Sequence, residues 1–137
     1  MPQYVSDEFD LADYRWTHRP LIVFGKGDLV VEQQKHLDAA KGKLADREML
    51  VVYVEGDAGG RVWDPSNDDG RSLTGTEAKK LLDAHNVKAG EFALLLVGKD
   101  GGEKRRETSP TPLKPIFDQI DSMPMRQQEM RQDGDQR

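Results

Sequence analysis

The sequence predicts an α/β domain with a mixed four-stranded sheet and helices on both faces. Three observations predict this class. Three short apolar runs, each suited to a strand buried on both faces, recur along the chain. Amphipathic segments with helical spacing separate them. The third run leads through an Asp-Gly turn into a strongly charged fourth segment, which is typical of a hairpin with an exposed edge strand.

The first apolar run covers residues 20–24 and stops at the Gly-Lys-Gly sequence of residues 25–27. Residues 29–46 then predict one amphipathic helix, with Asp28 as its N-cap and Gly42 near a fraying end. The apolar residues that recur at helical spacing in this segment are Val30, Leu37, Ala40 and Leu44.

The second apolar run, residues 49–54, predicts another buried strand. Residues 55–72 are rich in Gly, Asp, Asn and Arg, and they predict a long loop held in place by Trp63. Thr74 and Glu77 then form a capping box at the start of a second helix. Asn86 is a plausible left-handed residue at its end.

The third apolar run, residues 92–97, is followed by turn chemistry at 99–102 and by the charged strand 103–107. Thr111 is the predicted N-cap of the last helix, with Pro112 at its first position. Pro124 kinks or restarts the chain after that helix. The apolar face of this helix consists of Ile116, Phe117, Ile120 and Met123.

The element order is therefore β-α-β-α-β-β-α, which predicts two right-handed parallel crossovers followed by an antiparallel hairpin and a helix. This is the thioredoxin-like arrangement. A flavodoxin-type sheet is the main alternative, but it needs a fifth strand that the sequence does not predict. We expect one domain over residues 1–137, with a core at about 12–125 and flexible segments at 1–10 and 132–137.

Composition excludes several classes of function. The chain has 25 acidic and 20 basic residues and a formal net charge of -5, which argues against nucleic-acid binding. It has no cysteine, so thiol redox chemistry and thiolate metal sites are excluded. No run is long and apolar enough to predict a membrane span. No export signal is present, so the expected compartment is cytoplasmic as the sequence stands, or periplasmic or secreted if a signal has been removed.

Three segments carry a resemblance to a known family: residues 14–24 (YRWTHRPLIVF), residues 97–102 (VGKDGG), and residues 120–126 (IDSMPMR) with Glu129 and Met130. Over about residues 9–131 the chain resembles the prokaryotic DUDES-like family, domain-of-unknown-function family 4174, which is similar to a domain of vertebrate extracellular-matrix proteins. The resemblance implies a thioredoxin-like, peroxiredoxin-related fold without redox cysteines. It implies no established activity.

The main hypothesis is a non-catalytic protein-binding or structural module with an unknown protein partner. Its expected binding surface consists of Arg15, Trp16, Arg19, Met123, Met125, Arg126 and Met130. Methionines can form an adaptable surface flanked by cations. They can equally close the core, while the tryptophan packs over the sheet end and the arginines pair with acids elsewhere.

The alternative hypothesis is a small-anion receptor or a non-thiol enzyme that uses Lys26. Gly25, Lys26 and Gly27 stand at the start of the first predicted helix, where free backbone N–H groups favour an anion. The same glycines are explained by a strand-to-helix turn, and Asp28 would repel an anion.

The sequence predicts no catalytic residues, no cofactor and no metal site. His18, His36 and His85 are widely separated and lack metal-ligand spacing. The acidic residues between Asp64 and Gly70 are out of register with an EF-hand, so weak calcium binding by residues 57–72 stays open.

Overall fold

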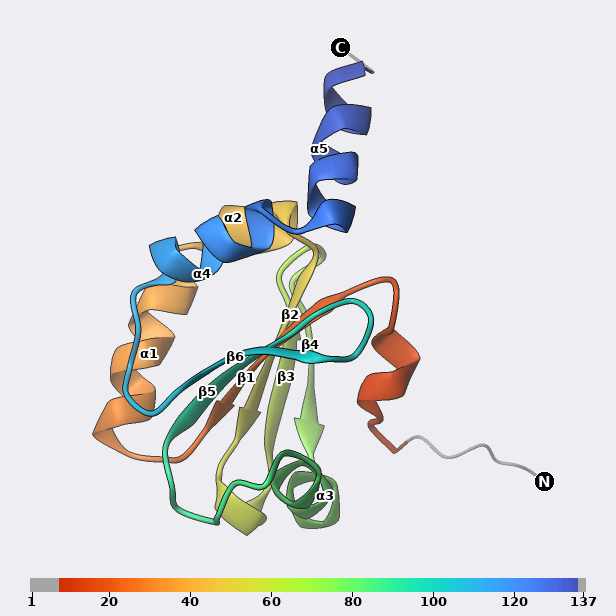
Figure 1. The fold of residues 1–137 in the computed structure, drawn as a ribbon. Coiled ribbons are helices and arrows are strands. Elements are labelled where there is room, and N and C mark those ends of the chain that lie inside the picture. The colour runs from red at the N-terminus through yellow and green to blue at the C-terminus, as the bar shows by residue number, and fades with distance from the viewer. Residues whose placement is uncertain (1–7, 136–137) are drawn as a thin grey trace, which may run out of the picture.

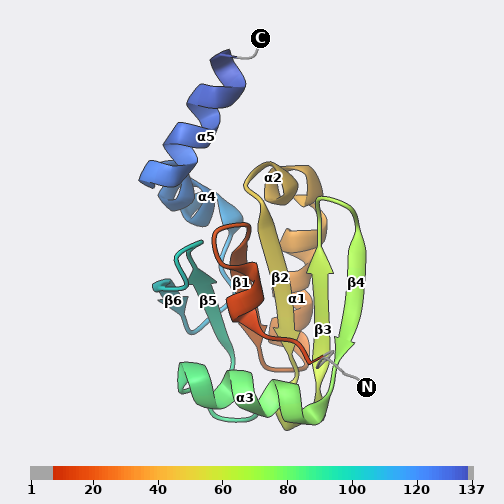
Figure 2. The same cartoon turned by 90° about the vertical axis from the view of Figure 1, so that its right-hand side faces the viewer.

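The computed structural model describes residues 8–135, with side chains described as far as residue 132. Its strands form one six-stranded sheet with the order β4-β3-β2-β1-β5-β6 (Figures 1 and 2). These strands are β1 (Arg19–Phe24), β2 (Met49–Val54), β3 (Gly60–Asp64), β4 (Asp69–Leu73), β5 (Ala93–Val97) and β6 (Glu103–Glu107). The helices are η1 (Leu11–Tyr14), α1 (Asp28–Asp38), α2 (Lys41–Asp46), η2 (Gly56–Ala58), α3 (Gly75–His85), α4 (Leu113–Asp121) and α5 (Pro124–Asp135).

The expectation of four strands is wrong, because residues 60–73 form the hairpin β3–β4 instead of a loop. β3 pairs antiparallel with β2, and Trp63 lies opposite Val51 in that strand pair. Only Val62 of β3 and Leu73 of β4 are buried. The apolar alternation that marks a half-buried strand is therefore missing from the sequence, and Gly and Asp further weaken the signal.

The expectation of two parallel crossovers is also wrong, because β1 and β2 are parallel but β5 is antiparallel to β1. Figure 2 shows the cause: α3 lies across the strands near one end of the sheet. The chain therefore enters β5 at the end where β2 and β4 finish, and it must run back in the opposite direction. The β5–β6 hairpin is antiparallel, as predicted, and β6 forms a charged edge.

Two apolar layers hold the helices on the sheet. On one face Leu21 and Val23 of β1 pack with Leu37, Leu44 and the apolar side of α4. On the other face Ile22 and Phe24 pack with Leu81 and Leu82 of α3, and with Leu11 and Tyr14 of η1. Alternate side chains of β1 thus enter opposite layers, which explains its unbroken apolar sequence. No helix among the described residues is long and apolar enough to cross a bilayer.

The helix ends follow the prediction at α3 and depart from it elsewhere. Thr74 and Glu77 form the predicted capping box, and Asn86 adopts the left-handed conformation. The predicted helix 29–46 is interrupted before Gly42, so α1 and α2 are separate. Gly27, and not Asp28, is the N-cap of α1.

The N-cap of α4 is Pro112, not Thr111, and the helix begins at Leu113. The backbone of Thr111 instead exchanges two hydrogen bonds with the buried side chain of Gln33, at 2.8 and 3.0 Å. Its hydroxyl donates to the carbonyl of Ser109 at 2.9 Å. The polar atoms of Thr111 therefore join the segment before α4 to α1 and leave the helix N-terminus uncapped by a side chain.

Gly60 in β3 allows the packing of the hairpin against β2 to be tested, and Gly42 in α2 serves as the control. A Cβ at Gly60 would lie 1.9 Å from the carbonyl oxygen of Tyr53, whereas a Cβ at Gly42 would meet nothing within 4 Å. We expect Gly60→Ala to lower the free energy of unfolding by about 2 kcal/mol or more through steric overlap. Gly42→Ala should leave it unchanged or raise it by up to about 1 kcal/mol, because alanine favours the helix. Urea denaturation of both variants measures the difference. Equal stabilities would contradict the strand pairing described here.

Candidate functional site

The start of β1 meets the beginning of α5 in a buried ion pair. Arg19, the first residue of β1, is only 1% exposed. Its guanidinium donates two hydrogen bonds to the carboxylate of Glu129 in α5, at 3.2 and 3.0 Å. A third hydrogen bond goes to the carbonyl of Arg47 at 2.9 Å. This bidentate geometry joins the first strand directly to the last helix.

Lys99 extends this pair from the end of β5. Its ammonium lies 2.7 Å from carboxylate oxygens of both Glu129 and Glu48, and its side chain is only 6% exposed. Glu48 has φ +52, and its carbonyl accepts the hydrogen bond from the backbone N–H of Arg19. One carboxylate of α5 therefore neutralises cations from two neighbouring strands.

Arg126 makes a second set of bonds one turn earlier in α5. It donates to Asp121 at 3.0 Å and to the carboxylate of Asp46 at 2.7 Å. Arg47 binds the same Asp121 at 3.1 and 2.8 Å, and its guanidinium lies 4.3 Å from the ring centre of Phe117. We call these residues together the ionic cluster: Arg19, Arg47, Lys99 and Arg126 with Asp46, Glu48, Asp121 and Glu129.

The environment of the cluster lowers the pKa of two of its acids. Burial raises the pKa of Glu129, but hydrogen bonds from Arg19 and Lys99 outweigh it, so the pKa is lower than normal. The pKa of Asp121 is lowered in the same way, against burial, by Arg47 and Arg126. The buried cations Arg19, Lys99 and Arg126 are thus each paired with carboxylates, of which those of Asp46 and Glu48 are half exposed.

The cluster includes two of the residues expected on a binding surface. Arg19 and Arg126 are buried, at 1% and 4% exposed, and both pair with acids. Their expected place on an open surface is therefore wrong, and the reading in which arginines pair with acids holds for them. Residues 124–135 form α5 (Figure 1), and Arg126 and Glu129 tie this helix to the cluster.

Of the other expected surface residues, Trp16, Met123 and Met125 line one pocket. Trp16 is 62% exposed, and Met125 and Met130 are 39% and 37% exposed. Met123 is partly buried against the core. A pocket of about 350 Å³, here called the Trp16 pocket, lies over the cluster. It is lined by Trp16, Arg19, Gly98, Lys99, Asp100, Lys104, Met123, Pro124 and Met125.

Trp16 is held in a left-handed backbone conformation, with φ +70. This conformation is a genuine outlier for a bulky residue. The backbone N–H of Trp16 donates to the carbonyl of Lys99 at 2.7 Å, which fixes the segment to the turn between β5 and β6. Arg15, the residue before it, lines a different cavity.

Sequence reasoning about sites missed the acids and Lys99, although a signal was present. Lys99, Asp121 and Glu129 all stand in the segments that carry the family resemblance. Read as surface chemistry, these motifs suggested a binding face and a hairpin turn. Together the three segments contain four strong cations and three acids, and a mixture of both signs is what a buried ionic network requires.

The alternative anion site at the start of α1 has no feature beyond its turn geometry. Gly25 and Gly27 have φ +123 and +86, and Lys26 is exposed. A Cβ at Gly25 would lie 3.3 Å from the Cα of Phe92, so close packing explains this glycine. The role of Lys26 stays a prediction.

The acidic residues between Asp64 and Gly70, for which weak calcium binding stays open, belong to the β3–β4 hairpin. Asp64 accepts from His18 at 3.0 Å, and Asp68 accepts from the indole N–H of Trp63 at 2.8 Å and pairs with Lys41. Within residues 8–135 there is no group of three or more His, Asp or Glu side chains placed to hold a metal ion.

Comparison with solved structures shows which fold this chain has. Thioredoxin peroxidase I of Plasmodium yoelii is similar with a TM-score of 0.60 and 14% identity, over 86% of this chain and 79% of that one. The mitochondrial 2-Cys peroxiredoxin of Plasmodium falciparum is similar with a TM-score of 0.55 and 9% identity, over 83% of this chain and 80% of that one. The fold is therefore thioredoxin-like, in a chain without cysteine.

The family follows from the sequence itself. Residues 10–129 match the model of the domain of unknown function DUF4174. The chain belongs to this family, and the matched segment includes every residue of the ionic cluster.

The low pKa of Glu129 predicts an acid-sensitive attachment of α5. A carboxyl whose pKa is lower in the folded than in the unfolded state stabilises the fold above its ordinary pKa, here 4.5, and loses this contribution as pH falls through the folded value. Glu129→Gln should lower the free energy of unfolding at pH 7 by about 1–3 kcal/mol. It should also flatten the loss of stability below about pH 4.5.

Urea titrations of wild type and variant at pH 7 and pH 3 give both quantities. Glu32→Gln, on the exposed side of α1, is the matched control and should behave as wild type. If Glu129→Gln and Glu32→Gln have the same stability at both pH values, the ion pairs of Glu129 contribute nothing to the fold.

Proposed function

We propose that this domain is a non-catalytic recognition module that binds a protein partner through the Trp16 pocket and the exposed methionines of α5. The observation that carries the proposal is Trp16 itself. A large aromatic side chain stands 62% exposed, in a left-handed backbone conformation, in a pocket whose apolar lining residues are Met123, Pro124, Met125 and Trp16 itself. Backbone strain of this kind is found where function requires a side chain to be presented.

The chemistry around Trp16 suits protein recognition. Tryptophan is enriched among residues that dominate binding energy at interfaces, and methionine adapts its shape to a partner. Met123, Pro124 and Met125 supply apolar walls, while Lys104 and Asp100 pair with each other at 2.9 Å on the rim. An apolar centre with a polar rim is the usual organisation of such interfaces.

The absence of cysteine supports a role without thiol catalysis. In a thioredoxin-like fold the reactive thiol stands at the start of the first helix, where this chain has Gly25, Lys26 and Gly27. A thiolate is the attacking group in peroxide reduction and disulfide exchange, and neither lysine nor glycine replaces it. The resemblance to DUDES-like domains, which are similar to a matrix-protein domain, also favours binding over catalysis.

Replacing Trp16 by glycine separates binding from stability. Glycine accepts φ +70 without strain, so Trp16→Gly should be as stable as wild type or more stable, by up to about 1–2 kcal/mol. The same change removes the proposed contact and should weaken partner binding by about 30-fold or more. A tryptophan needed only for packing would instead make the variant less stable.

The measurement is quantitative affinity capture from extracts of cells that contain the protein, followed by titration of the captured partner. Val31→Ala is the matched control, because Val31 is a 51% exposed apolar residue on α1, away from the Trp16 pocket. We expect the same partner with wild type and Val31→Ala, and its loss with Trp16→Gly. Equal capture by all three proteins would overturn the proposal.

A further inference from the structure

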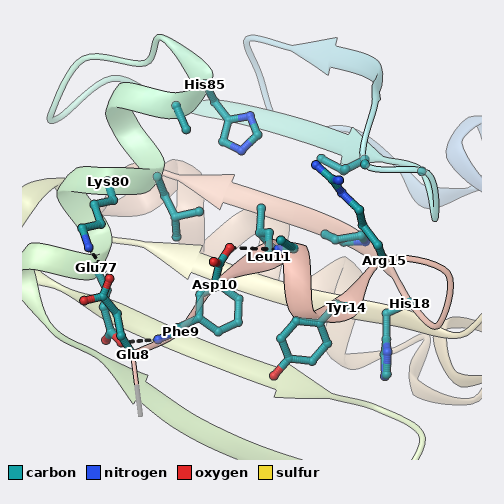
Figure 3. A pocket seen from close by; sticks show the side chains of 17 residues that line it. Glu8, Phe9, Asp10, Leu11, Tyr14, Arg15, His18, Glu77, Lys80 and His85 are labelled. Atoms are coloured by element: carbon teal, nitrogen blue, oxygen red, sulfur yellow. Dashed lines mark hydrogen bonds and ion pairs between the residues drawn. The ribbon is translucent and has the colours of Figure 1, made fainter. Parts of the chain in front are cut away.

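A second cavity, also of about 350 Å³, lies on the other side of the segment that carries Trp16 (Figure 3). It lies between η1, α3 and the turn after β5. Leu11 of η1, Leu81 of α3 and Val97 of β5 are among its apolar lining residues. Its volume falls within the range of small-molecule sites.

The carboxylates that line this cavity are already committed to other groups. Asp10 accepts from the backbone N–H of Ala12 at 3.0 Å. Glu77 is buried, accepts from Thr74 and Phe9, and pairs with Arg71. Glu8 pairs with Lys80. None of these acids therefore neutralises the remaining polar side chains of the cavity.

Arg15 is the cation without such a partner. Its guanidinium makes no hydrogen bond or ion pair with any described residue, whereas those of Arg19, Arg47 and Arg126 are each paired with acids. Its guanidinium packs over Gly101, where a Cβ would lie 2.7 Å from Nε and 3.3 Å from Cζ of Arg15. The position of the guanidinium thus depends on a glycine in the β5–β6 turn, which has φ +88.

His85 is the second unpartnered polar side chain of the cavity. The centre of its ring lies 6.1 Å from the ring centre of Phe24. The imidazole makes no hydrogen bond to any described residue. Burial lowers the pKa of His85, Glu103 opposes this effect, and Arg106 adds to it, so the ring is neutral at pH 7. A neutral imidazole offers one N–H donor. Figure 3 shows Glu8 and Glu77 at one end of the cavity and Arg15 at the other, with His85 between them.

We propose that this cavity binds a small organic monocarboxylate with an apolar body. The carboxylate takes hydrogen bonds from the guanidinium of Arg15 and the imidazole of His85, and the body packs against Leu11, Leu81 and Val97. Glu8 and Glu77 at the other end disfavour a second negative charge (Figure 3). This site does not depend on the Trp16 pocket, because Gly98 is the one residue that lines both.

Phenylacetate is the probe. Its binding to the full chain is measured by titration and followed by two-dimensional amide NMR. We expect shifts at Leu11, Arg15, His85 and Gly101, with binding at least tenfold weaker in Arg15→Met and in His85→Leu. Both substitutions keep an apolar side chain of similar length or bulk. Arg131→Met, which removes an exposed arginine of α5, should bind as wild type does.

Two further ligands identify what the cavity recognises. Phenylacetamide keeps the ring but not the charge, and it should bind at least tenfold more weakly than phenylacetate. Inorganic phosphate keeps charge but not the apolar body, and it should produce no saturable shift at Arg15. Equal binding of phenylacetate and its amide, unchanged affinity in Arg15→Met, or phosphate binding as tight as phenylacetate would each overturn the proposal.

Discussion

The bidentate pair between Arg19 and Glu129 is the interaction on which the described site depends. A guanidinium buried at the first position of a central strand is costly unless a carboxylate meets it. That carboxylate comes from α5, 110 positions later in the chain, and Lys99 binds it too. The pair therefore fixes the start of β1, the end of β5 and the base of α5 relative to one another. Trp16, Met123 and Met125 lie directly over these three elements.

The same arrangement places two cavities on either side of one short segment. Trp16 lines one and Arg15 lines the other, and both residues are held by contacts to the β5–β6 turn. The fold is thioredoxin-like, and the ionic cluster and the Trp16 pocket lie at the opposite end of β1 from Gly25 and Lys26. Recognition at the start of β1 is the function that we propose from this geometry.

Much of the fold could be predicted from the sequence, because the decisive signals were local. Unbroken apolar runs marked β1, β2 and β5, and the Thr74–Glu77 capping box marked α3. β3 and β4 were missed because each buries only one residue, so their pairing comes from backbone hydrogen bonds to β2 and to each other. Of the residues expected on a binding surface, Trp16 and Met125 are exposed but Arg19 and Arg126 are buried, and partner binding by this surface stays a prediction.

The sequence by itself determined the strands of the centre, the capping of α3, the lack of thiol chemistry and the segments shared with a family. These depend on residue type and on spacing over a few positions. Only the tertiary structure decided the direction of β5, the pairing of Arg19 with Glu129, and the division of Arg15 and Trp16 between two cavities. The reason is that a charged residue has the same appearance in a sequence whether it faces water or a distant partner. Its energy depends on which of these it meets once the chain has folded.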